Sequence, residues 1–120
     1  MTTAGQTLPR AVALGGGHGL HATLHALRVL AAQGHISDAV TAVAIVADDG
    51  GSSGRLRREL GLLPPGDLRM ALAALAADDP VGQRWAEVVQ HRFGGTGALA
   101  GHAVGNLILA GLMETLGDPV

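Results

Sequence analysis

Four short segments of the chain hold residues suited to binding a phosphate or a sugar. The first is the run Gly15, Gly16, Gly17, His18 and Gly19, which separates an apolar segment from a helical pattern. Glycines let backbone N–H groups approach a phosphate, and a helix N-terminus adds roughly half a positive charge. Leu20 replaces the third glycine of the dinucleotide fingerprint, and the Lys and Ser/Thr of a P-loop are missing. The run predicts a phosphate or nucleotide cradle, with a tight strand-to-helix turn as the alternative.

The second segment follows a charge-free, β-branched run and is both acidic and rich in glycine. Its candidate residues are Asp48, Asp49, Gly50, Gly51, Ser52, Ser53 and Arg55. In an open α/β sheet, ligands bind at the carboxyl ends of the strands. A carboxylate there accepts hydrogen bonds from sugar hydroxyls or holds magnesium, and an arginine pairs with phosphate. The alternative is a solvated acidic turn before a helix that Ser52 or Ser53 caps.

The two remaining segments each carry a pair of polar candidates. Asp67 and Arg69 follow Pro64-Pro65-Gly66, and His102 and Asn106 open the last helical pattern. All four could contact a ligand, and His102 could act as a base. The alternatives are that Asp67 is the N-cap of a helix, and that His102 and Asn106 are a buried, hydrogen-bonded pair.

Metal and nucleophilic chemistry are less well supported. His18, His21 and His25 have helical spacing, but no Glu lies between them and the chain has no Cys, so an exposed helix face is favoured over zinc. Ser52-Ser53 lacks the Gly-x-Ser-x-Gly elbow of a serine nucleophile. We therefore assign no metal site and no catalytic residue.

These candidates depend on a predicted strand–helix–strand unit. Residues 11–14 read as a strand and residues 20–32 as a helix that stops near Gly34. Residues 40–47 are apolar without a charge, as in a strand buried on both faces. Such a unit predicts a parallel sheet.

The rest of the chain reads as helical. Helices are predicted over residues 53–60, 68–77, 81–92 and 103–116, with a glycine-rich loop at 94–101 and a stop at Gly117. Two strands leave open edges and an uncovered sheet. We therefore expect residues 11–120 to be the N-terminal portion of a single, incomplete α/β domain. Residues 1–10 are expected to form a polar leader before it.

Composition excludes several classes of protein. With eight arginines, no lysine and a net charge of −2, the chain has no strong positive electrostatic field that would attract nucleic acid. Without cysteine there is no disulfide framework, and residues 1–10 lack a signal-peptide pattern. Residues 93–113 are uncharged over the length of a membrane span, but His102, Asn106 and several glycines argue against insertion.

The four segments, in this order, resemble the YvcK-type gluconeogenesis factors of the CofD-like superfamily. The resemblance covers roughly residues 10–119 and departs from the family at His18, where many members carry Thr. It implies a Rossmann-like α/β fold with a parallel sheet and flanking helices. It also implies binding of UDP-N-acetylglucosamine, with NAD and magnesium as further candidate ligands. Residues Gly15–Gly19 would hold phosphates, and the candidates from the other three segments would line the same cleft.

The function implied is that of a cytoplasmic, non-catalytic regulator of cell shape and cell-wall precursor supply during gluconeogenic growth. Its partners would be a nucleotide sugar, a second copy of the chain or a regulatory protein. The alternative is the other branch of the superfamily, a transferase that moves phospholactate onto a deazaflavin precursor. The family's chains are more than twice as long as the 120 residues of this sequence.

Overall fold

The computed structural model describes residue 5 and residues 7–117. Strand β1 (Ala11–Gly15) pairs in parallel with β2 (Val40–Ala44), from Ala11 opposite Val40 to Gly15 opposite Ala44. Helix α1 (Gly17–Ala32) joins the two strands, which confirms the predicted strand–helix–strand unit. Of the predicted leader, only Gly5 and residues 7–10 lie within the described residues.

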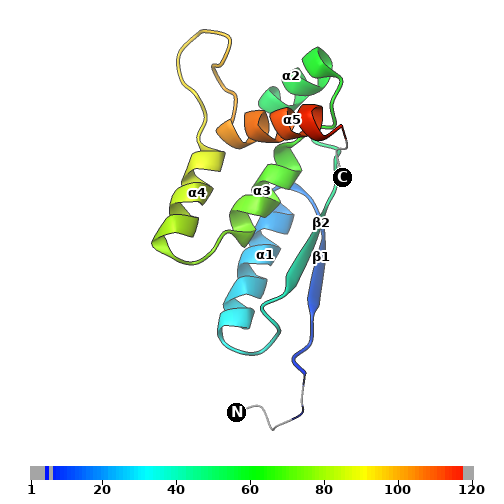
Figure 1. The fold of residues 1–120 in the computed structure, drawn as a ribbon, viewed down its shortest axis with the longest axis vertical. Helices are drawn as coiled ribbons and strands as arrows, with labels where there is room; N and C mark the ends of the chain where they lie inside the picture. Colours follow the sequence, from blue (N-terminus) through cyan, green and yellow to red (C-terminus); the bar gives the residue numbers. More distant parts are fainter. Residues whose placement is uncertain (1–4, 6, 118–120) are drawn as a thin grey trace.

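Four further helices follow the sheet, where the sequence predicts them. They are α2 (Gly51–Leu60), α3 (Gly66–Leu75), α4 (Pro80–Gln90) and α5 (Val104–Leu116). Figure 1 shows α1 and α3 side by side next to the strands, with α5 lying across the end of α3. The loop between α4 and α5 is closed by a bridge between Arg92 and Ala103.

The apolar core lies between the sheet, α1 and α3. Leu20 and Leu24 of α1 pack with Ala13 of β1 and with Ala71 and Ala74 of α3. Alanine side chains at three of these five positions let the two helices and the sheet approach closely, so the near absence of aromatic residues is compatible with a packed core.

Strand β2 differs from its prediction in length and in burial. Its ladder ends at Ala44 rather than residue 47, because β1 turns away after Gly15 and offers no further partner beyond the Ile45 N–H bond to Gly15 O, at 2.8 Å. The strand is not buried on both faces either. Val43 is 49% exposed, and on β1 Val12 is 59% exposed and Leu14 is 75% exposed. Among the described residues, α1 and α3 cover one face of the sheet and the other face is open.

Candidate functional site

A cavity of about 200 Å³ opens at the carboxyl ends of the two strands. It is bordered by the start of α1, the segment after β2, the first turns of α2 and α3, and Arg92, which lies just beyond α4. The residues that line it are Gly17, His18, Asp48, Gly50, Gly51, Ser52, Ser53, Asp67, Arg69, Met70 and Arg92. Nine of these eleven were predicted from sequence as site residues. Three of the four segments therefore line one cavity, as expected for an open α/β sheet.

Asp67 connects α3 to the beginning of α1. Its Oδ1 atom accepts a hydrogen bond of 2.6 Å from the Gly17 N–H, which lies in the first turn of α1. A Cβ at Gly16 would come within 2.9 Å of the Asp67 carboxyl carbon and 2.6 Å of Ile45, so this approach requires glycine. The predicted N-cap role of Asp67 is wrong. Helix α3 begins at Gly66 with Pro65 as its N-cap, which leaves Asp67 inside the first turn and directed at α1.

Ser52 and Ser53 are also not N-caps. Helix α2 begins at Gly51 after Gly50, so both serines lie within its first turn and are almost completely buried. Asn106 Nδ2 donates to both hydroxyl oxygens, at 3.0 Å to Ser52 and 3.3 Å to Ser53. The Ser52 Oγ also accepts the Ala103 N–H at 3.3 Å and lies 2.9 Å from His102 Nδ1. The serines therefore join α2 to the start of α5.

The direction of these hydrogen bonds follows from Arg69, which can only donate. Its Nε donates to Asn106 Oδ1 at 2.9 Å, so the Asn106 amide must point its Nδ2 at the serines. Ser52 then accepts two N–H donors and has its own proton left for His102 Nδ1. His102 is consequently neutral, with its proton on Nε2. We call Arg69, Asn106, Ser52 and His102 the polar relay.

Burial lowers the pKa of His102, and the nearby Arg55 charge lowers it further, while Glu59 acts in the opposite direction. This agrees with the neutral imidazole that the polar relay requires. The pKa of Arg69 is likewise lowered, first by burial and then by the Arg92 charge, with Asp48 opposing. Within the described part of the chain, each fully buried side-chain nitrogen and oxygen has a hydrogen-bond partner.

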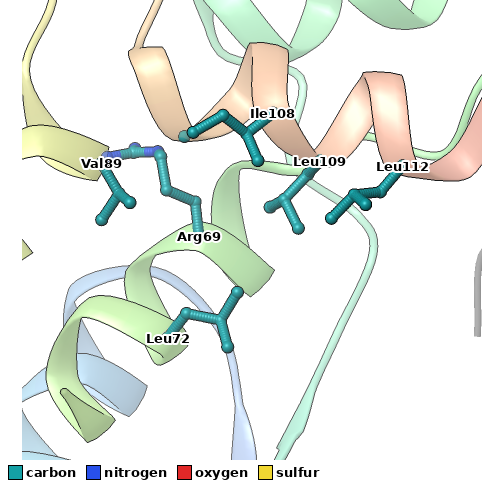
Figure 2. A pocket seen from close by; sticks show the side chains of 7 residues that line it. Arg69, Leu72, Val89, Ile108, Leu109 and Leu112 are labelled. Atoms are coloured by element: carbon teal, nitrogen blue, oxygen red, sulfur yellow. The ribbon is translucent and has the colours of Figure 1, made fainter. Parts of the chain in front are cut away.

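Arg69 also separates the polar cavity from an apolar one. Figure 2 shows its side chain extending from α3 toward Val89, beside Ile108 of α5. Arg69 also lines this apolar pocket, which has a volume of about 120 Å³ and is otherwise lined by Leu72, Val89, Gly105, Ile108, Leu109 and Leu112. Its Nη1 donates to Gln90 Oε1 at the end of α4. One arginine thus holds α3, α4 and α5 together.

Seven predicted site residues do not line the cavity. These are Gly15, Gly16, Gly19, Asp49, Arg55, His102 and Asn106. Asp49 points outward and forms ion pairs with Arg57 (3.4 Å) and Arg58 (3.9 Å). Arg55 donates to the carbonyl oxygens of Ala98 and Ala100, so it anchors the glycine-rich loop. His102 and Asn106 are buried and each is hydrogen-bonded to Ser52 rather than to the other, so they support the cavity through the polar relay.

Sequence reasoning missed Met70, Arg92 and Gln90. Arg92 lines the cavity and donates to Gly101 O at 2.9 Å, so its position depends on the loop closing back onto α4. The available signal was an arginine two residues before the glycine-rich loop. Gln90 had no signal, because only the packing of α4 against α3 brings it to Arg69.

The described residues contain neither a cluster of metal ligands nor a helix that could cross a membrane. Within residues 7–117, three or more His, Cys, Asp or Glu side chains do not gather in a way that could hold a metal ion. Over the same residues, the helices are too short or too polar to cross a membrane.

Sequence comparison identifies the family of the chain. The sequence model of the CofD family, described as 2-phospho-L-lactate transferase CofD, matches residues 11–120. The chain belongs to the CofD family. This membership confirms the resemblance seen in the four segments.

Relatives of this CofD-family chain carry the name gluconeogenesis factor. A Mycobacterium leprae protein named "Putative gluconeogenesis factor" is 66% identical over 112 residues, which are 93% of this chain and 30% of that protein. A Mycobacterium tuberculosis relative of the same name is 68% identical over 109 residues. The Bacillus subtilis "Gluconeogenesis factor" is 46% identical over 92% of this chain and 32% of its own length. The chain therefore spans about 30% of the length of these relatives.

Two crystal structures of a Bacillus halodurans protein share the fold. One is 43% identical, with a TM-score of 0.78, over 94% of this chain and 33% of that one. The other, described as a member of the UPF0052 family, has a TM-score of 0.79 over 96% of this chain and 34% of that one. These similarities confirm the predicted α/β class, with a parallel sheet and flanking helices.

Proposed function

We propose that this CofD-family chain contributes a nucleotide-sugar site to a gluconeogenesis factor, and that UDP-N-acetylglucosamine is its ligand. The observation that carries the proposal is the cavity at the carboxyl ends of the strands, where carboxylates, serine hydroxyls and arginines converge. Carboxylates accept hydrogen bonds from sugar hydroxyls, and arginines bind phosphate oxygens. The names of the relatives support a role in gluconeogenic growth.

The wider biological role is part of the same proposal. The protein would act in the cytoplasm as a non-catalytic regulator that links sugar-nucleotide supply to cell shape and cell-wall precursors. Magnesium would bind with the diphosphate, and NAD is a second candidate nucleotide. A second copy of the chain or a regulatory protein would receive the signal.

At about 200 Å³, the cavity is smaller than the roughly 300 Å³ lower bound of typical small-molecule sites. We infer that it holds part of the ligand.

Calorimetry with UDP-N-acetylglucosamine tests the ligand. We expect saturable heat with the wild-type chain and about ten- to one-hundred-fold weaker binding for Asp48→Asn, since a hydrogen bond to a charged group contributes about 1.5–3 kcal/mol. Asp38→Asn is the matched control, because this carboxylate lines a different cavity with Arg28 and Val40. Absence of heat at millimolar ligand with a full-length gluconeogenesis factor that contains this chain would refute the proposal.

The second candidate function is transfer of phospholactate to a deazaflavin precursor, which the description of the family model favours. An assay with a deazaflavin acceptor and an activated phospholactate donor distinguishes the two. Turnover that Asp48→Asn abolishes and Asp38→Asn leaves intact would establish the transferase and displace the regulator. We expect no turnover.

A further inference from the structure

Helix α4 carries an apolar stripe on its outer side. Val81, Trp85 and Val88 recur at intervals of four and three residues, so they lie along one side of the helix. Val81 is 68% exposed, Trp85 is 58% exposed and Val88 is 37% exposed. A contiguous exposed apolar surface that includes a tryptophan is typical of a contact between proteins, because aromatic residues are enriched at the centres of interfaces.

The inner side of α4 holds the helix in the fold. Val89 lies so close to α5 that a Cβ at Gly105 would meet it, and Gln90 accepts a hydrogen bond from Arg69 of α3. Figure 1 shows α4 on the side of α3 away from the two strands. The stripe is therefore distinct from the sheet and from the polar cavity, whose eleven lining residues all lie outside α4.

Two opposite charges lie beside the stripe, on the same flank of the helix. At about 100° per residue, Arg84 and Glu87 are both on the side of the stripe away from α5. Within the described part of the chain, the ion pairs closer than 4.0 Å are those of Asp49 with Arg57 and Arg58. At that distance, Arg84 and Glu87 are thus paired neither with each other nor with another charge of the described residues.

An antiparallel pair of α4 helices from two copies of the chain fits both the stripe and the charges. In a twofold contact the same surface serves both copies. If the axis lies midway between residues 85 and 86, residues 84 and 87 are each about 2 Å from it along the helix, in opposite directions. Arg84 of each copy then lies opposite Glu87 of the other, and the two Trp85 side chains meet at the axis. A parallel pair would instead place the charged flank against the uncharged one.

We propose that α4 is a dimerisation surface whose partner is a second copy of the chain, packed antiparallel through Val81, Trp85 and Val88. Two Arg84–Glu87 pairs across the twofold axis set the register of the helices. One helix pair is small beside the roughly 1,200–2,000 Å² of stable complexes, so the dimer is reversible and depends on protein concentration. This inference does not depend on the proposed ligand.

Sedimentation equilibrium of a full-length gluconeogenesis factor that contains this chain tests the dimer. We expect the wild-type protein to dimerise as its concentration rises, and Trp85→Ala to weaken dimerisation at least about thirty-fold. Arg84→Glu and Glu87→Arg should each weaken it about ten-fold, because two attractive pairs become two repulsive ones. Arg57→Glu is the matched control. It reverses an exposed arginine of α2 and should leave dimerisation unchanged.

Mixing the two charge-reversed proteins identifies the contact. In a heterodimer of Arg84→Glu with Glu87→Arg, both pairs across the axis are again complementary, so the mixture should dimerise nearly as well as the wild type. Damage within one copy would not be repaired by mixing, and thermal melts confirm that each variant is folded. If the mixture associates no better than either variant alone, the inference is wrong. A wild-type protein that stays monomeric up to about 1 mM also overturns it.

Discussion

At the scale of single residues, the proton on His102 is determined by a group three hydrogen bonds away. Arg69 fixes the Asn106 amide, Asn106 leaves Ser52 only its own proton to give, and that proton goes to His102 Nδ1. Protonating the imidazole would place a second donor against the Ser52 hydroxyl hydrogen. Burial and the Arg55 charge oppose protonation as well.

The lowered pKa of His102 gives the stability of the chain a pH dependence of known sign. Between its folded value and the unfolded value of about 6.5, the unfolded chain binds more protons, so the free energy of unfolding falls as pH drops below about 6.5. We expect urea midpoints to decrease over this range. In the His102→Gln variant the decrease in the urea midpoint should be smaller. His35 is exposed, so the His35→Gln variant should show the same decrease as the wild type. Equal pH slopes in all three proteins would contradict the polar relay.

The residue types predicted the position of the site more accurately than the role of each residue in it. Asp67, Ser52 and Asn106 were all identified from the sequence, because each is a polar residue at the start of a helical pattern that follows a break containing glycine. Their partners were not, since the Asp67–Gly17 contact spans 50 residues and the Asn106–Ser52 contact spans 54. Local spacing carries no information about which helix end a carboxylate reaches. For this reason the sequence left an N-cap role open as the alternative for Asp67 and the serines, and the structure shows that alternative to be wrong.

At the scale of elements, the order of helices and strands follows from apolar periodicity and glycine positions. The observed ends of an element differ from the predicted ends where tertiary contacts determine them. Strand β2 stops at Ala44 because β1 supplies no further partner. Helix α4 begins at Pro80, since the Asp79 side chain accepts the Gly82 N–H at 2.6 Å and caps it. Sequence placed Asp79 in a break between helices and did not identify this cap.

The approach of α5 to α3 and α4 depends on one glycine. A Cβ at Gly105 would lie 2.7 Å from Val89 O and 2.9 Å from Arg69 Cγ, whereas a Cβ at Gly111 of the same helix meets nothing within 4 Å. We expect Gly105→Ala to lower the free energy of unfolding by about 1–3 kcal/mol through overpacking. Gly111→Ala should raise it by up to about 1 kcal/mol. Urea denaturation measures both, and equal effects would show that α5 is not held at this contact.

At the scale of the whole molecule, the open face of the sheet is the largest departure from what the sequence predicts. A charge-free β-branched strand indicates burial on both faces, but the described residues cover only the side of Ala13, which is 7% exposed. On the other side Val12, Leu14 and Val43 form a contiguous apolar surface, which we call the open sheet face. The chain spans about 30% of the length of its relatives, and an apolar face of this kind on an isolated chain favours association.

We expect the open sheet face to bind the dye ANS and to promote self-association of the 120-residue chain. Replacing Val12, Leu14 and Val43 together by Thr keeps β propensity while removing apolar surface, so dye fluorescence and the sedimentation coefficient at high concentration should both fall. Leu24→Thr is the matched control. It places the same hydroxyl on the covered side, where Leu24 is fully buried, and should lower the melting temperature instead. If the triple variant binds as much dye as the wild type, the exposed apolar surface lies elsewhere, with the groove beside Leu72, Ile108 and Leu112 in Figure 2 as the next surface to test.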